Sequence, residues 1–303
     1  LNIPPALQVS ELIEDLRERL RPLKSSLFPQ QVLLELTDTA LLGQSLLNGQ
    51  PGPICIDVPL PSLTCRQGQP VEIDPLADLI GDLLVRDGLI DAYVMAALPQ
   101  SAVQWRVIDW AGGTAPEDAA AELRQLNPDL GLPYPLAEAA IDLQPLSAAP
   151  GKHLLATTPR VVVEGWIQVF HQAGTNLDRL ACPQTCRLAA LQGHLAETPA
   201  GTLLLVLTSQ SESRRLEAVR EGVPLFQWPL PQEAEATVAE VKRCLAFLRR
   251  NFREIRQVHL LLDGEWEEQT ELESVLGAPA HQLNCAPFAS LVLQGLAIPE
   301  LMP

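Results

Sequence analysis

The chain has 303 residues, of which 47% are hydrophobic and 19% charged, so it can bury a core and is not of the disordered class. Its net charge of −16 argues against a nucleic-acid partner, because affinity for a phosphate backbone comes from basic patches. No apolar window reaches the roughly 18 residues of a membrane span, and a signal-peptide plan is missing, so we expect a cytoplasmic protein without direct membrane insertion.

The cysteines and histidines are dispersed along the chain. Cys182 and Cys186 form a single CxxxC pattern, and a structural zinc site would need a second pair of ligands at matching spacing. We therefore expect reduced, buried thiols and no metal.

The first 29 residues carry an amphipathic helix at 9–23, with apolar residues at three- and four-residue spacing after Ser10, which fits an N-cap. This extension either packs on the rest of the protein or places the extended segment LNIPP in a groove meant for a partner peptide.

The first half of the chain then predicts a strand meander and an inserted module. The meander covers 30–39, 41–50 and 52–61, and Asn48-Gly49 predicts a hairpin turn between its last two strands. A helix at 75–86 and a buried strand at 90–97 follow. A change of composition from 102 to 146 then indicates a small strand–helix–strand module whose helix covers 116–126.

After Ala148–Gly151, strands and helices alternate. The expected elements are a strand at 153–157, a helix at 160–173, a strand at 177–181, a helix at 184–195, a second meander at 203–207, 215–220 and 224–229, a helix at 232–252, a strand at 257–262, a helix at 266–276, a strand at 281–285 and a helix at 288–296. The densest positive stretch, 243–253, lies on the long helix and is interpreted as a solvated face. Each half thus has a meander followed by alternating helices and strands, which indicates a duplicated α/β structure.

The order of elements carries a resemblance to a known family. The strand DAYVMAALP followed by the module that begins AVQWRVIDW, and the tail QVHLLLDGEWEEQTELESVLGAPAHQLNCAP, resemble the PilM-like type IV pilus assembly proteins of the actin-like ATPase superfamily. The chain is also similar to the cytoplasmic domain of the type II secretion L protein. The resemblance covers about 30–300 and implies a bilobed actin-like (ribonuclease H-like) α/β fold. Its expected parts are an extension at 1–29, a first lobe at 30–197 with the module at about 100–148, and a second lobe at 198–303.

This resemblance implies ATP with magnesium between the lobes, but the phosphate-binding turns depart from the family pattern. Where the family has Asp-x-Gly, the first turn has Glu35-Leu36-Thr37 and the second has Val206-Leu207-Thr208, so β-branched side chains stand where backbone should meet phosphate. We therefore expect a degenerate nucleotide site without cofactor or catalytic residue, made of Glu35, Thr37, Asp38, Thr208, Ser209, Asp263 and Gly264. The alternative is a working ATPase in which Glu35, Thr208, Ser209 and Asp263 surround Mg-ATP.

The resemblance also implies a scaffold that is peripheral to the inner membrane through its partners. Its groove, which involves the inserted module, would hold the cytoplasmic N-terminal peptide of a PilN-like membrane protein, and pilus motor ATPases are further possible partners. The expected apolar anchors are Trp105, Ile108, Trp110 and Tyr134, unless these side chains cover the module's own core. A cell-division protein anchored by a C-terminal amphipathic helix is disfavoured, because the tail AIPELMP is short and ends in proline.

Overall fold

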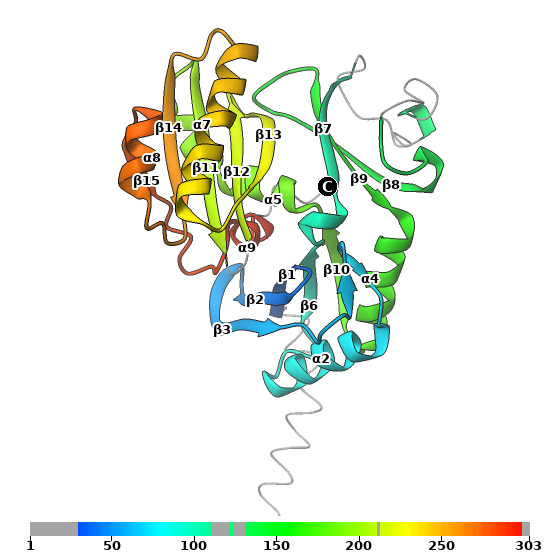
Figure 1. The fold of residues 1–303 in the computed structure, drawn as a ribbon. Coiled ribbons are helices and arrows are strands. Elements are labelled where there is room, and N and C mark those ends of the chain that lie inside the picture. The colour runs from blue at the N-terminus through cyan, green and yellow to red at the C-terminus, as the bar shows by residue number, and fades with distance from the viewer. Residues whose placement is uncertain (1–29, 111–120, 124–130, 211–212, 299–303) are drawn as a thin grey trace, which may run out of the picture. The chain divides into compact units, whose positions relative to one another are not determined.

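The computed structural model describes residues 30–110, 121–123, 131–210 and 213–298 (Figure 1). The helix expected at 9–23 and most of the one at 116–126 lie outside the described residues. The described chain forms two compact units: the first contains 30–103 with 160–183, and the second contains 104–159 with 184–298.

The first unit is built on a five-stranded sheet of order β10-β6-β1-β2-β3. Strands β1 (Gln30–Leu36), β2 (Ala40–Leu47) and β3 (Gln50–Pro59) form the antiparallel meander, while β6 (Tyr93–Ala97) and β10 (Asn176–Ala181) run parallel to β1. Asn48 and Gly49 connect β2 and β3 with φ values of 54° and 74°, the two positive angles that the tight hairpin turn requires. The predicted hairpin is confirmed.

Helices α2 (Ile73–Arg86) and α4 (Arg160–Gln172) pack against each other in this unit. Helix α2 buries Leu76, Ala77, Ile80, Leu83 and Leu84, the apolar stripe expected from three- and four-residue spacing. A small hairpin of β4 (Cys65–Arg66) and β5 (Gln69–Pro70) lies against α4.

The second unit contains another five-stranded sheet, of order β13-β12-β11-β14-β15. Strands β11 (Thr202–Gln210), β12 (Ser213–Arg220) and β13 (Val223–Leu230) form an antiparallel meander, and β14 (Gln257–Asp263) and β15 (Ala280–Gln282) extend it in parallel. This order repeats that of the first unit strand for strand. The structural duplication expected from the sequence is confirmed.

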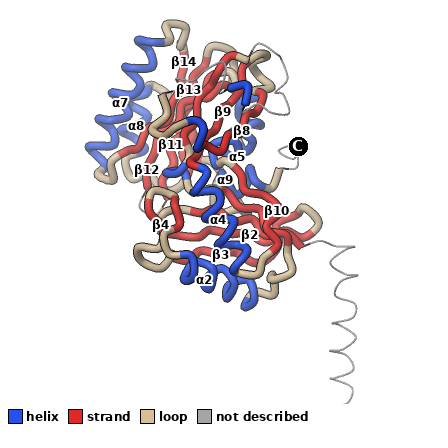
Figure 2. Tube along the Cα trace, turned by 90° about the vertical axis from the view of Figure 1, so that its right-hand side faces the viewer, coloured by secondary structure: helices blue, strands red, loops and turns tan. Residues whose placement is uncertain are grey.

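Both faces of this second sheet are covered (Figures 1 and 2). Leu203, Leu205 and Leu207 of β11 face helices α7 (Ala234–Asn251) and α8 (Gln269–Leu276). Leu204 and Val206 face the opposite core, which includes side chains of α5 (Pro183–Ala190) and α9 (Leu291–Leu296). Burial on both faces explains why β11 reads as a continuous apolar run without alternation.

A three-stranded antiparallel sheet, β7-β9-β8, completes the second unit. Its strands are β7 (Gln104–Asp109), β8 (Ala139–Pro145) and β9 (Lys152–Pro159), with short 3₁₀ turns η1 (Gln100–Ala102) before β7 and η2 (Leu136–Glu138) before β8. Trp105 and Val107 of β7 pack against the core around Leu204. The module expected within the first lobe therefore groups with the second unit, because an apolar face of its sheet is buried there.

Several element boundaries differ from those expected. The helix expected at 184–195 is two helices, α5 and α6 (Gln192–Glu197), separated by Leu191. Helix α9 begins at Leu291, where the Ser290 hydroxyl accepts a hydrogen bond from the Leu293 N–H at 3.1 Å. A serine N-cap of this kind sets the start of a helix more strongly than the apolar pattern does.

Candidate functional site

The turn after β1 contains the first group of predicted site residues. The Thr37 hydroxyl accepts hydrogen bonds from the N–H groups of Thr39, at 3.2 Å, and Ala40, at 2.7 Å. The Thr37 N–H and hydroxyl both donate to the Ala40 carbonyl, at 3.0 and 2.9 Å. The amide groups of Thr37, Thr39 and Ala40 are thus bound within the turn, whereas a phosphate-binding turn directs such groups outward.

Asp38 is bound to the β4–β5 hairpin of the same unit. Its Oδ1 accepts a hydrogen bond from the Gly68 N–H at 2.5 Å and lies 3.6 Å from the Cys65 Sγ. Burial and the Asp38 carboxylate raise the pKa of the Cys65 thiol to about 12, so this thiol stays protonated. Glu35 is buried near the end of β1, in register with Leu42 of β2 and Ala97 of β6.

The second unit brings the other four predicted residues together. Thr208 of β11 is in register with Asp263 of the parallel strand β14. Gly264 follows with φ +88°, and a Cβ at this position would lie 2.3 Å from the Ser209 carbonyl oxygen, so the backbones touch here in a way that only glycine allows. The pairing of β11 with β14 therefore produces one cluster at the carboxyl ends of two parallel strands.

Asp263 is the acid of this cluster. Its Oδ1 lies 3.6 Å from the Cys285 Sγ, whereas its buried Oδ2 has no hydrogen-bond partner among the described residues. Burial raises the pKa of Asp263 above its ordinary value, and the Arg187 guanidinium partly offsets the rise. A buried carboxylate oxygen without a donor is the kind of group that a cation or a ligand could satisfy.

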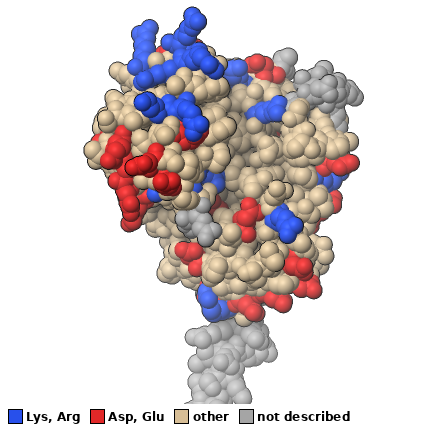
Figure 3. Space-filling model, viewed as in Figure 1, with Lys and Arg blue, Asp and Glu red and all other residues tan. Residues whose placement is uncertain are grey.

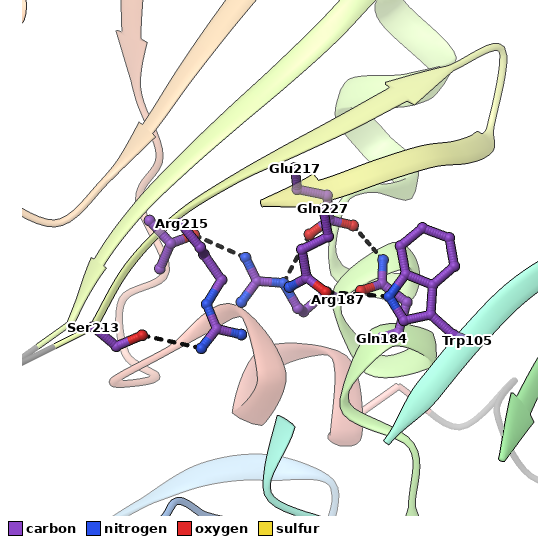
Figure 4. A network of polar contacts seen from close by, with 8 residues as sticks. Trp105, Gln184, Arg187, Ser213, Arg215, Glu217 and Gln227 are labelled. Atoms are coloured by element: carbon purple, nitrogen blue, oxygen red, sulfur yellow. Dashed lines mark hydrogen bonds and ion pairs between the residues drawn. The ribbon is translucent and has the colours of Figure 1, made fainter. Parts of the chain in front are cut away.

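Next to Thr208 lies a buried ion pair that the sequence did not reveal (Figure 4). Arg187 of α5, 2% exposed, donates from Nε to the Glu217 carboxylate of β12, 0% exposed, at 2.8 Å. The same guanidinium donates to the Thr208 hydroxyl at 2.8 Å, and Gln184 donates to the other oxygen of Glu217. Both carboxylate oxygens and the threonine hydroxyl are thereby engaged within the fold.

Two sequence features could have drawn attention to this pair, although neither identifies the partner. Glu217 interrupts the apolar run of Leu216, Ala218 and Val219, and Arg187 stands in a segment otherwise short of charge. Thirty residues separate the two, so only the packing of α5 beneath the sheet brings them together.

The four predicted anchor residues do not share one surface. Trp105 lies on the face of the three-stranded sheet that packs against the core around Leu204, and its Nε1 donates to Gln227 of β13 at 3.1 Å (Figure 4). Ile108 and Trp110 lie on the opposite face, and the Tyr134 hydroxyl lies 2.9 Å from the Thr157 hydroxyl.

Trp110 belongs to a small core of its own. It is 6% exposed and packs with Leu123, Leu143 and Leu155, and Ile108 lies against this cluster. The alternation of β7 explains the division, because successive side chains of a strand point to opposite faces. Trp110, and Ile108 in part, thus pack on the module's own core, and Ile108 and Tyr134 are both half-buried.

No family model and no curated protein sequence matches this chain. Solved structures do: the structure described as the PilM-PilN type IV pilus biogenesis complex has a TM-score of 0.64 and 21% identity, over 90% of this chain and 99% of that one. The chain has an actin-like fold. A Bacteroides thetaiotaomicron protein with an actin-like ATPase fold gives a TM-score of 0.50 at 10% identity, over 88% of this chain and 95% of that one. The cytoplasmic domain of EpsL, an inner membrane component of the Vibrio cholerae type II secretion system, gives 0.51 at 11%, over 90% and 95%.

This outcome confirms the α/β actin-like fold class and the similarity to PilM and EpsL structures expected from the order of elements. Among the described helices, none is long and apolar enough to cross a membrane. In the same part of the chain, no three His, Cys, Asp or Glu side chains gather as a metal-ion site requires.

Proposed function

We propose that this protein is a PilM-like scaffold of type IV pilus assembly that binds the cytoplasmic N-terminal peptide of a PilN-like membrane protein. The observation that carries the proposal is its likeness, over 90% of this chain and 99% of the matched one, to a structure described as a PilM-PilN type IV pilus biogenesis complex. Binding of such a peptide would hold the protein in the cytoplasm at the inner membrane, where pilus motor ATPases are further candidate partners.

The three-stranded sheet favours one face for the peptide. The Trp105 face is packed against the unit's own core, so it offers no open surface there. The opposite face presents half-buried Ile108 and Tyr134 beside buried Trp110. We therefore place the peptide's apolar side chains against Ile108 and Tyr134, where burial of aromatic and aliphatic groups contributes most to affinity.

A synthetic peptide copying the cytoplasmic N-terminus of the PilN-like protein from the same organism provides the test. We expect Tyr134→Ala and Ile108→Ser to weaken its binding at least about tenfold in fluorescence anisotropy, since such anchors contribute about 1–2 kcal/mol or more. Val161→Ser, which changes an exposed apolar residue of the first unit, is the matched control. Unaltered binding by both module variants, or no binding by the wild-type protein, would overturn the proposal.

We further propose that the nucleotide site is degenerate and that the protein is not an ATPase. Three amide groups of the first turn are bound within the turn itself, and the Thr208 hydroxyl is bound by Arg187. Groups engaged in this way do not fit a magnesium nucleotide without breaking hydrogen bonds that the fold already makes. This supports a scaffold retained for its shape.

Asp263 favours the second candidate, a protein that binds Mg-ATP. Its unpaired, buried Oδ2 and raised pKa are the features of a carboxylate that a cation would stabilise. A thermal shift assay with magnesium and millimolar ATP separates the two, because a ligand that binds only the native state must raise the apparent stability. We expect no shift for the wild-type chain, and a shift that disappears in Asp263→Asn would establish the second candidate instead.

A further inference from the structure

Strand β13 and helix α7 expose a cluster of aromatic rings in the second unit. Phe226 stacks on Trp228 with ring centres 5.6 Å apart and lies 5.8 Å from Phe247 of α7. Trp228 is 43% and Phe247 45% exposed, and β13 is an edge strand of its sheet. Single exposed apolar residues are ordinary on protein surfaces, but rings in mutual contact form a patch of the kind found at interaction sites.

The end of α7 next to these rings is strongly basic. Residues 241–256 contain six basic side chains and one acidic one, a net charge of +5 within a chain whose total is −16. Figure 3 shows Lys and Arg side chains gathered and projecting at the end of the second unit. The unpaired members, those with no carboxylate within ion-pair distance among the described residues, are Lys242, Arg249, Arg250, Arg253 and Arg256.

Ordinary helix electrostatics explains only part of this arrangement. Cations in the last turn of a helix, such as Arg249 and Arg250, are stabilised by the helix dipole. Arg253 and Arg256 lie beyond the helix, however, and the dipole gives no reason for an exposed ring beside them. Phe247 lies three residues before Arg250, so these two side chains are neighbours on the helix surface.

We propose that this aromatic–basic surface, formed by Phe226, Trp228, Phe247 and the five unpaired basic residues, binds an anionic lipid bilayer. The positive charge of this surface attracts an anionic partner, and the acidic remainder of the chain repels one, so such a partner binds here. Aromatic rings beside Lys and Arg are the combination that settles at the boundary between lipid headgroups and acyl chains.

The shape of the surface favours a planar partner over an acidic peptide. A peptide is held where side chains line a groove, whereas the Lys and Arg side chains that Figure 3 shows on the second unit project outward. A bilayer surface needs no groove to contact side chains that project outward. The contact involves only the lipid surface and needs no spanning segment, and it is independent of the proposed peptide site on the three-stranded sheet.

The test is flotation of the full chain with phosphatidylglycerol–phosphatidylcholine vesicles and with phosphatidylcholine vesicles alone. We expect binding to the anionic vesicles only, and weaker binding at high salt, because screening shortens the reach of surface charges. Each basic residue near an anionic surface contributes about fivefold to the partition coefficient, so the double variant Arg250→Gln/Arg253→Gln should lower it by about 25-fold. Phe247→Ser should lower it by about tenfold, at low and high salt alike.

Matched variants on the first unit keep the experiment specific. Arg66→Gln/Arg160→Gln removes the same charge from exposed positions, and Ile167→Ser removes an exposed apolar residue. Both controls should bind as the wild type does, and circular dichroism verifies that all variants are folded. The proposal is overturned if the wild-type chain does not float with anionic vesicles. That is the result expected if the surface binds an acidic peptide and not a bilayer. It is equally overturned if the controls lose binding as much as the test variants.

Discussion

The buried pair Arg187–Glu217 gives the sharpest stability prediction. Replacing Arg187 with Met leaves the Glu217 carboxylate buried, at 0% exposure, with Gln184 as its remaining side-chain hydrogen-bond donor. The substitution also removes the hydrogen bond from Arg187 to the Thr208 hydroxyl. Breaking one partner of a buried pair costs about 3–5 kcal/mol, because an uncompensated charge remains in a medium of low polarity. Glu217→Leu should cost a similar amount, since it leaves the guanidinium buried.

The double variant Arg187→Met/Glu217→Leu should be far more stable than the sum of the single changes predicts. Replacing both charges with apolar groups of similar volume removes the desolvation penalty together with the attraction, and such replacements are often neutral or stabilising. Urea unfolding measures each step. At a slope of about 2 kcal/mol per molar, a loss of about 4 kcal/mol lowers the midpoint by about 2 M.

Lys152–Asp109 provides the matched comparison within the same unit. Its N–O distance is 2.9 Å, close to that of the buried pair, but its side chains are 43% and 86% exposed. An exposed pair contributes about 0–1 kcal/mol, so Lys152→Met should shift the midpoint little. If Arg187→Met cost no more than Lys152→Met, or if the single effects of the buried pair were simply additive, the reasoning from burial would be refuted.

Three further predictions concern the predicted site residues. Gly264→Ala places a Cβ 2.3 Å from the Ser209 carbonyl oxygen and should lower the free energy of unfolding, measured by thermal unfolding, by more than about 2 kcal/mol. Gly49→Ala is the control: a Cβ there has no atom within 4 Å, so only the smaller penalty of its positive φ applies. Equal losses of stability in the two variants would contradict this. Thr37→Val should cost about 1–3 kcal/mol and Thr37→Ser much less, because serine keeps the hydroxyl; hydrogen exchange in the turn after β1 checks it. Because the folded-state pKa of Asp263 is raised, its contribution to stability increases as pH falls through that pKa, so any advantage of Asp263→Asn should be greatest at neutral pH and shrink on acidification.

Local patterns were enough to predict most of the fold. The continuous apolar run of β11, the Asn48-Gly49 turn and the spacing of buried residues in α2 are each set by short-range periodicity or backbone preference. Their order along the chain then predicted the duplicated meander and the actin-like class. Element boundaries were predicted less well where the apolar pattern does not mark the end of a helix. The helix expected at 184–195, for example, is interrupted at Leu191 between α5 and α6.

The site residues depend in part on contacts between distant segments, which local patterns do not reveal. The sequence pointed to Thr208 and Asp263, which the parallel pairing of β11 and β14 does place side by side. It did not point to Arg187 and Glu217, because nothing local relates residues thirty positions apart. It also grouped Trp105 with Ile108 and Trp110, although odd- and even-numbered residues of a strand face opposite ways and Trp110, just past β7, packs on the same side as Ile108.

The sequence by itself determined the strands, the helices and their repeated order, because each depends on the chemistry of neighbouring residues. It also predicted that two turns depart from the family's Asp-x-Gly pattern, at Glu35-Leu36-Thr37 and at Val206-Leu207-Thr208. Only the tertiary structure decided that the inserted module packs with the second unit, that Arg187 binds Thr208, and that Phe247 stays exposed beside a basic helix end. These facts depend on which surfaces become buried against each other, and that is settled by packing between distant segments.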